Sequence, residues 1–312
     1  MNAKIKGYIL GSVAAATYGT NPLFALPLYA DGMDAESVLF FRYLLAAPMV
    51  ALMLKLRGRR FGCARAEAWP LVFVGVMAAL SSLTLFLSYG YMDAGIASTM
   101  LFVYPLMVAL IMSLCYGERM QLSTVLCLIM ALCGIGLLFK AGDGAMLSLT
   151  GTLLVMASSL TYAVYIVAVN RPGLREVPTL RIIFYTLCIG VMIYGAKIVV
   201  TPGASFSVPT HWYMWGCLIG LALLPTVVSF LCTTEAIHCI GSTPTAILGA
   251  LEPLTAVFFG ITVFGETMTP RDWLGLALIV IAVSIVVGGG SFTSYLVRFR
   301  RLFPSLRGRK RF

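Results

Sequence analysis

Two charged side chains stand inside long apolar stretches of the sequence. Arg42 lies in LFFRYLLAA and Glu252 lies in LGALEPLTA. A charge at the centre of a membrane helix costs about 2.5–3.5 kcal/mol, so it needs a partner, water or protonation. Because Pro253 removes a backbone donor and loosens the preceding turn, Glu252 is the leading candidate for contacting a solute or exchanging a proton. Arg42 either takes part in such a site or extends to lipid headgroups.

Three sets of polar residues recur at helical spacing, which places each set on one face of a helix. Small hydroxylated residues commonly join packed helices by hydrogen bonds, so interhelical packing is the first interpretation of any one set. A polar cavity is the second interpretation. The three sets are Ser81, Thr84 and Ser88; Thr226, Ser229 and Thr233; and Ser158, Tyr162 and Tyr165.

The chain repeats a motif 148 positions apart, at residues 104–118 and 252–266. Each copy begins with X-Pro, continues through apolar residues and closes with Gly-Glu, at Glu118 and Glu266. These two glutamates are expected to cap or pair helix ends. Tyr18 in the first half also corresponds to Tyr162 in the second, at an offset of 144. Internal duplication of this kind is typical of secondary transporters.

The composition identifies a membrane protein. Hydrophobic residues make up 60% and charged residues 11% of the chain, and the mean hydropathy is +0.95. A soluble domain carries about a quarter charged residues. Ten apolar segments are expected as membrane helices, which predicts an all-α, polytopic fold. The segments are 7–29, 37–56, 70–90, 95–116, 121–139, 149–169, 179–200, 212–233, 243–264 and 272–289.

Ten helices divide into two halves of five, predicted at residues 1–145 and 146–290 and followed by a basic tail at 291–312. Because five is an odd number, the halves must lie in the membrane with opposite orientation, as an inverted repeat. Equivalent side chains, such as Tyr18 with Tyr162 and Asn21 with Tyr165, are then expected near the axis that relates the halves.

The positions of the basic residues predict the topology. Eighteen Lys and Arg fall in one set of loops and termini and three in the other, with Arg42 inside a helix. Both termini are therefore expected in the cytoplasm of a multi-pass plasma (inner) membrane protein. The net charge of +10 is explained by loops and a tail that face anionic lipid, and nucleic-acid binding is disfavoured.

The cysteines and histidines do not predict a metal site or a cofactor. The eight cysteines are scattered and the two histidines stand alone, whereas metal sites need clustered ligands. A membrane-embedded enzyme would need a nucleophile with a base, or such a cluster, and is disfavoured.

The two apolar-embedded charges, the stripes and the repeat together predict a central cavity. The side chains expected to line it are Tyr18, Asn21, Tyr104, Tyr162, Tyr165 and Glu252. Further residues are expected behind this lining or in coupling solute movement to proton movement. They are Arg42, Ser81, Ser88, Thr226 and Thr233.

Two five-helix halves, the repeated Pro-to-Gly-Glu motif and Phe41-Arg42 resemble the EamA family of the drug/metabolite transporter superfamily. The resemblance covers the chain to about residue 289. It implies ten helices, both termini inside and a central cavity formed by helices 1, 3, 4, 6, 8 and 9. Members mostly export amino acids and related metabolites. This sequence departs from the family at Tyr18-Gly19-Thr20-Asn21-Pro22, where a Trp-Gly-Ser-Asn-type run is common. It agrees with the family at residues 252–253, where Glu-Pro is a frequent form.

The resulting prediction is a secondary transporter that exports a small organic solute, an amino acid or related metabolite, by alternating access. A monomer suffices in principle, and the oligomeric state stays open. Phosphorylated solutes would need several buried cations, and only Arg42 qualifies. The alternative is efflux of lipophilic cations, with Glu252 exchanging a proton for the solute.

Overall fold

The computed structural model describes residues 2–58, 61–91, 97, 100–117, 122–138, 149–200, 206–249, 251–263, 270–271, 273–275, 277–278, 280–282 and 285. All regular secondary structure in these ranges is helical. Glu118, Glu266 and the tail at 291–312 lie outside them. The helices are α1 (Ala3–Tyr18), α2 (Asn21–Ala30), α3 (Ala35–Leu56), α4 (Arg65–Ser88), α6 (Tyr104–Tyr116), α7 (Leu122–Leu138), α8 (Leu149–Val169), α9 (Pro172–Arg175), α10 (Thr179–Val200), α11 (Trp212–Ala222), the π-helical segment η1 (Leu223–Val228), α12 (Ser229–Ile240), α13 (Ser242–Leu248) and α14 (Leu251–Thr262).

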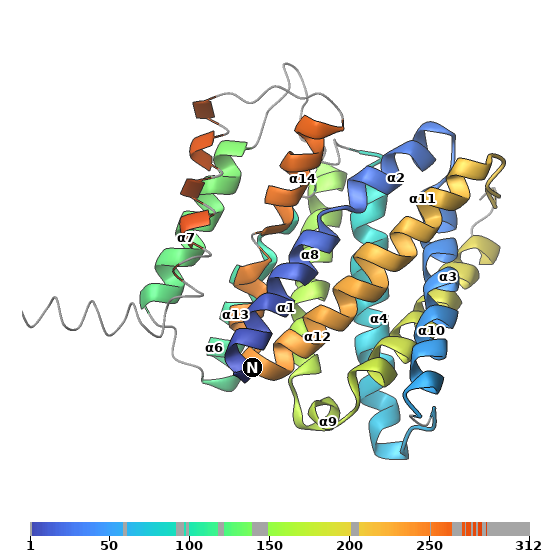
Figure 1. Ribbon diagram of the computed structural model, residues 1–312, viewed down its shortest axis with the longest axis horizontal. Helices are drawn as coiled ribbons and strands as arrows, with labels where there is room; N and C mark the ends of the chain where they lie inside the picture. Colours follow the sequence, from blue (N-terminus) through green and yellow to red (C-terminus); the bar gives the residue numbers. More distant parts are fainter. Residues whose placement is uncertain are drawn as a thin grey trace, which may run out of the picture.

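The helices form a bundle in which segments from the two halves of the sequence alternate (Figure 1). Helix α1 packs against α12 and α14, and α4 packs against α8 and α10. A hydrogen bond from the Ser229 hydroxyl to the Ala14 carbonyl, 3.0 Å long, joins α12 to α1. The centre of the bundle is therefore built by both halves.

Five stretches within the described residues are long and apolar enough to cross a membrane: α3, α4, α8, α10 and the continuous run from Trp212 to Ile240. Other predicted segments are interrupted helices. The predicted helix at 7–29 is divided into α1 and α2, and the one at 243–264 is divided into α13 and α14. A count of ten spans stays a prediction.

The two ends of the bundle differ in charge. The end that carries the start of α1, α9 and the start of α10 is rich in Lys and Arg, and we call it the basic end (Figure 1). The opposite end, where α2 meets α3, carries Asp31, Asp34 and Glu36, and we call it the acidic end.

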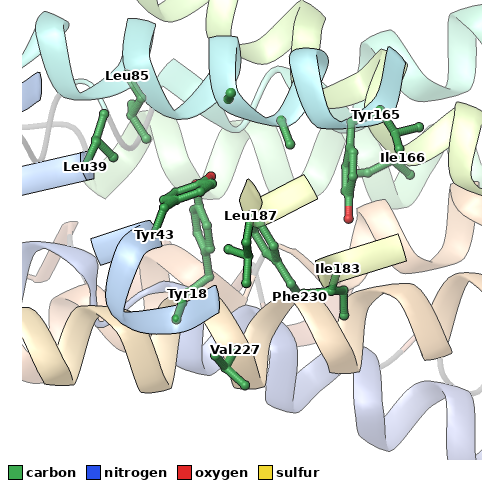
Figure 2. Packing of buried hydrophobic residues seen from close by; sticks show 14 of the residues in the cluster. Tyr18, Leu39, Tyr43, Leu85, Tyr165, Ile166, Ile183, Leu187, Val227 and Phe230 are labelled. Atoms are coloured by element: carbon green, nitrogen blue, oxygen red, sulfur yellow. The ribbon is translucent and has the colours of Figure 1, made fainter. Parts of the chain in front are cut away.

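Aromatic rings fill much of the core between the helices. Tyr43 of α3 meets Tyr194 of α10 edge to face, with ring centroids 5.0 Å apart. The ring centroids of Tyr165 of α8 and Phe230 of α12 lie 6.1 Å apart. Figure 2 shows Tyr43, Tyr165 and Phe230 among the buried Leu, Ile and Val side chains. Such pairs contribute about 0.5–1.5 kcal/mol beyond the area that they bury.

Candidate functional site

Three helices begin in the middle of the bundle, each at or beside an X-Pro pair. Pro22 lies in the first turn of α2 and Pro105 in the first turn of α6, and α14 begins two residues before Pro253. Proline is tolerated in a first turn because the missing N–H has no partner within the helix there. The sequence therefore places helix starts, rather than continuous helices, around the centre.

Glycines allow these helix starts to touch one another. A Cβ added to Gly19, between α1 and α2, would lie 2.5 Å from the Glu252 carbonyl oxygen. A Cβ on Gly249, between α13 and α14, would overlap the Tyr104 hydroxyl. Only residues without a side chain fit this close approach, so the interruption in α1–α2 lies directly against the interruption in α13–α14.

A small cavity lies at this junction, and we call it the central cavity. Its volume is about 20 Å³, which is room for about one water molecule and not for a metabolite. Both halves contribute to its wall. The polar side chains that line it are Tyr18, Tyr104, Tyr162, Ser229, Thr233, Thr245 and Glu252.

Four tyrosines form a continuous aromatic cluster beside the central cavity. Tyr162 stacks on Tyr18 and on Tyr165, with centroids 6.1 Å apart in each pair. Tyr104 meets Tyr162 edge to face at 4.8 Å and donates a hydrogen bond of 3.2 Å to the Ala246 carbonyl. The predicted meeting of Tyr18 with Tyr162 is thus observed.

Glu252 reaches the central cavity from the first turn of α14. No described cation lies within 4.0 Å of its carboxyl oxygens. A carboxyl group without an ion pair inside a membrane bundle is a candidate for binding a cationic group or a proton.

Arg42 is fully buried, at 0% exposure, so it does not extend to lipid headgroups. Its Nε donates to Thr226 Oγ1 at 2.5 Å, one terminal nitrogen to Asn21 Oδ1 at 2.9 Å and the other to the Pro225 carbonyl at 3.1 Å. The guanidinium also lies 5.5 Å from the centre of the Phe86 ring. Arg42 therefore ties α3 to the start of α2 and to η1 in the other half of the chain.

The predicted polar stripes have different environments. On α4, Ser81 exchanges hydrogen bonds with Ser158 of α8, and Ser88 bonds to the carbonyl of Leu85 in its own helix. In this stripe Ser81 joins α4 to α8, and none of its three residues lines the central cavity. On α12, Thr233 does line it.

Tyr165 and Asn21 lie beside the central cavity rather than in its wall. Their predicted meeting is not among the described contacts: Tyr165 packs on Phe230, and Asn21 bonds to Arg42. Sequence reasoning missed Thr245 and Gly249, which line the central cavity. The Gly-Ala pair just before Leu-Glu-Pro was the available signal for that helix interruption.

The acidic end is closed by polar contacts between the halves. The Tyr213 hydroxyl donates to Asp31, and the Ser207 hydroxyl donates to Asp34 at 2.8 Å. Lys197 and Glu36 form an ion pair of 2.6 Å. These contacts tie the α2–α3 connection and the first turn of α3 to the end of α10, to Ser207 and to the start of α11.

The basic end is more open. Cavities of about 400 and 560 Å³ flank the ends of α1 and α12 there, and His238 lines both of them. An ion pair of 3.5 Å between Lys6 and Glu235 lies at the second cavity. The described residues contain no group of three or more His, Cys, Asp or Glu side chains placed to hold a metal ion.

Residues 5–140 and residues 149–288 each match the EamA-like transporter family. The threonine/homoserine exporter RhtA of Escherichia coli (strain K12) is 28% identical over 227 residues, which cover 72% of this chain and 72% of that protein. An uncharacterized transporter of Archaeoglobus fulgidus is 30% identical over 193 residues, 62% of this chain and 67% of the relative. A crystal structure with 18% identity superimposes with a TM-score of 0.76 and covers 96% of this chain and 99% of the other, so the fold is shared.

Proposed function

We propose that this chain, which belongs to the EamA-like transporter family, exports an amino acid or related small solute by alternating access across the plasma membrane. The basic end faces the cytoplasm in this proposal, because Lys and Arg are enriched in cytoplasmic loops. The solute enters from that end and leaves at the acidic end.

The observation that carries this proposal is the junction of the helix starts. Glu252 and the tyrosines 18, 104 and 162 come from both halves and surround one cavity. In repeat transporters, substrate sites lie at the interface of the repeats, where interrupted helices expose polar backbone groups. The described geometry has these features at the same place.

Amino acids are the favoured solutes for two reasons. A relative from Escherichia coli is described as a threonine/homoserine exporter, which supports the class without fixing the solute. The site also combines a carboxyl group with aromatic rings, and both attract an ammonium group.

Alternating access explains the small volume of the central cavity. A cavity of about 20 Å³ describes a closed state in which the tyrosines occupy the solute's place. The contacts of Asp31, Asp34 and Glu36 must separate before a solute leaves at the acidic end.

Counterflow in proteoliposomes tests the proposal. Purified protein should exchange labelled threonine, homoserine or another amino acid across the bilayer in a saturable way. Tyr162→Ala should lower the rate by about tenfold or more, because it removes a ring that faces both Tyr18 and Tyr104. Leu160→Ala on the same helix is the matched control, since that side chain is 50% exposed on the outer face of the bundle. If Tyr162→Ala transports as well as Leu160→Ala does, the tyrosine cluster is a packing device.

A second candidate is efflux of lipophilic cations in exchange for protons. The unpaired Glu252 carboxyl and the tyrosine rings favour it, because cations bind over aromatic faces. The same liposomes distinguish the two: a cationic dye driven by a pH gradient, with no exchange of any amino acid, would select this candidate.

A further inference from the structure

Arg42 is a buried cation without a carboxylate partner among the described residues. Its side chain is 0% exposed, and no described Asp or Glu oxygen lies within 4.0 Å of its nitrogens. Its three hydrogen bonds go to neutral oxygens, whereas a guanidinium has five N–H groups. Buried charges are normally paired, so this position is suited to receive an anion.

Asn21 presents an unused donor at the same place. Its side chain is 3% exposed, its Oδ1 accepts from Arg42, and its Nδ2 has no hydrogen-bond partner among the described residues. The bond to Arg42 fixes which way the amide points, because only the oxygen can accept. A buried amide donor without a partner is destabilising, and an incoming anion would satisfy it.

The backbone adds a third positive element. Asn21 is the first residue of α2, a helix of 10 residues whose start lies inside the bundle. Unpaired N–H groups and the helix dipole favour negative charge at such a start. The cation, the amide donor and the helix start therefore act on the same point.

Glu252 lies close to this point. Gly19 lies two residues before Asn21 in the sequence, and a Cβ added to it would lie 2.5 Å from the Glu252 carbonyl oxygen. Arg42, which bonds to Asn21, and Glu252 thus supply one positive and one negative group at the same junction of interrupted helices, and a zwitterion needs both charges.

We propose that Arg42 and Asn21 form a carboxylate subsite for the transported solute, while Glu252 faces the solute's ammonium group. The inference rests on the proposed function and adds a chemical requirement to it: the solute must carry a carboxylate. Neither Arg42 nor Asn21 lines the central cavity, so the α1–α2 junction moves when the solute binds.

Melting of the purified protein measures binding independently of transport. L-threonine, L-leucine and L-glutamate are each compared with the corresponding α-carboxamide, which keeps the ammonium group and lacks the carboxylate. At least one free amino acid should raise the melting temperature, and its amide should need about 100-fold higher concentration or more, as for a site built around a polar group that the ligand lacks. Equal stabilisation by acid and amide, or no stabilisation by any acid, overturns the subsite.

Asn21→Asp places a carboxylate of the protein itself beside Arg42. This carboxylate should fill the subsite in place of the solute's carboxylate. The variant should fold, because it pairs the buried cation, and stabilisation by the free amino acid should disappear. Asn170→Asp makes the same chemical change at the basic end, beside the cavity that Lys4 and Arg175 line, and should bind as the parent does. Retained binding by Asn21→Asp overturns the subsite.

Transport in proteoliposomes separates this inference from the proposed function. Binding that prefers acids over amides, in a protein that moves none of them, leaves the subsite standing and removes the transport proposal. Transport of amino acids and amides at equal rates removes the subsite and leaves the transport proposal standing.

Discussion

The two halves of the chain differ in how an equivalent pair of helices is joined. In the first half, Arg42 of α3 inserts its charge between the start of α2 and η1. The position 144 residues later is Thr186 of α10, whose buried hydroxyl has no hydrogen-bond partner in the described part of the chain. Helix α10 packs instead on the regular helix α4, where the Tyr194 hydroxyl donates to the Ala79 carbonyl at 3.0 Å.

The difference originates in a few residues. Pro225 interrupts the backbone of the Trp212–Ile240 run, and the Thr226 hydroxyl takes up the freed carbonyl of Leu221 at 2.7 Å. The π-helical segment forms there, as is common at functional positions. The matching part of α4 has no proline and remains an α-helix. Duplication thus gives both halves the same helical scaffold. Single-residue differences between the halves place the polar groups in only one of them.

The helix starts of the two halves also differ in the polar group that they present. Tyr104 and Glu252 occupy matching positions, 148 residues apart, and both line the central cavity. One has a neutral hydroxyl and the other a carboxyl group. The comparison therefore predicts that the second half supplies the titrating group and the first half the aromatic wall.

The largest effect is expected from Glu252→Gln, which keeps the shape of the side chain and removes its titration. Accumulation of solute driven by a pH gradient should fall by about 100-fold or more, as on loss of a positioned proton-transfer group, while exchange at equal concentrations continues. Tyr104→Phe removes one hydrogen bond and should change transport by at most about tenfold. Both rates are measured in the same proteoliposomes, and a Gln variant that concentrates solute like the parent would make Glu252 a structural residue.

A second test concerns the opposite orientation of the halves. Cys63 follows α3 and Val208 follows α10 at matching positions, 145 residues apart, and they lie toward the basic and the acidic end. A membrane-impermeant thiol reagent on intact cells should label Val208→Cys, where the native side chain is 53% exposed, and should miss Cys63 until the membrane is permeabilised. Labelling of Cys63 alone would reverse the orientation.

The smallest effect is expected from the paired hydroxyls. Thr226→Val removes the acceptor for the Arg42 Nε and the donor to Leu221, so it should lower the free energy of unfolding by about 1–3 kcal/mol. Ser81→Ala at the matching position removes only a hydrogen-bonded contact with Ser158 and should cost about 0.5–1.5 kcal/mol. Thermal unfolding of both variants measures the difference, and equal costs would mean that the Arg42 contacts add no stability.

Much of the fold was predictable from the sequence because apolar length dominates in a membrane protein. The predicted segments 149–169 and 179–200 coincide with α8 and α10, and the EamA resemblance is confirmed by the family match. Two predicted helices proved to be interrupted, at Gly19 and Gly249. Hydropathy cannot detect these interruptions, since glycine and proline are common in membrane helices and the chain stays apolar through them.

The candidate site was predictable in part. Internal repetition paired Tyr18 with Tyr162, and their rings do stack. The environment of Arg42 was not predictable, because its partners at 225 and 226 are distant in sequence and depend on a local π-helical distortion. Nor could helical spacing distinguish Ser81 of α4, which bonds to another helix, from Thr233, which lines the central cavity.

The small volume of the central cavity also has an energetic consequence for the cell. A space of about 20 Å³ accommodates about one water molecule, and ions do not cross a bilayer without a continuous file of water or polar groups. In this state the central cavity therefore offers ions no such path. A membrane that stores energy as an ion gradient can contain many copies of such a protein without short-circuiting that gradient between transport cycles.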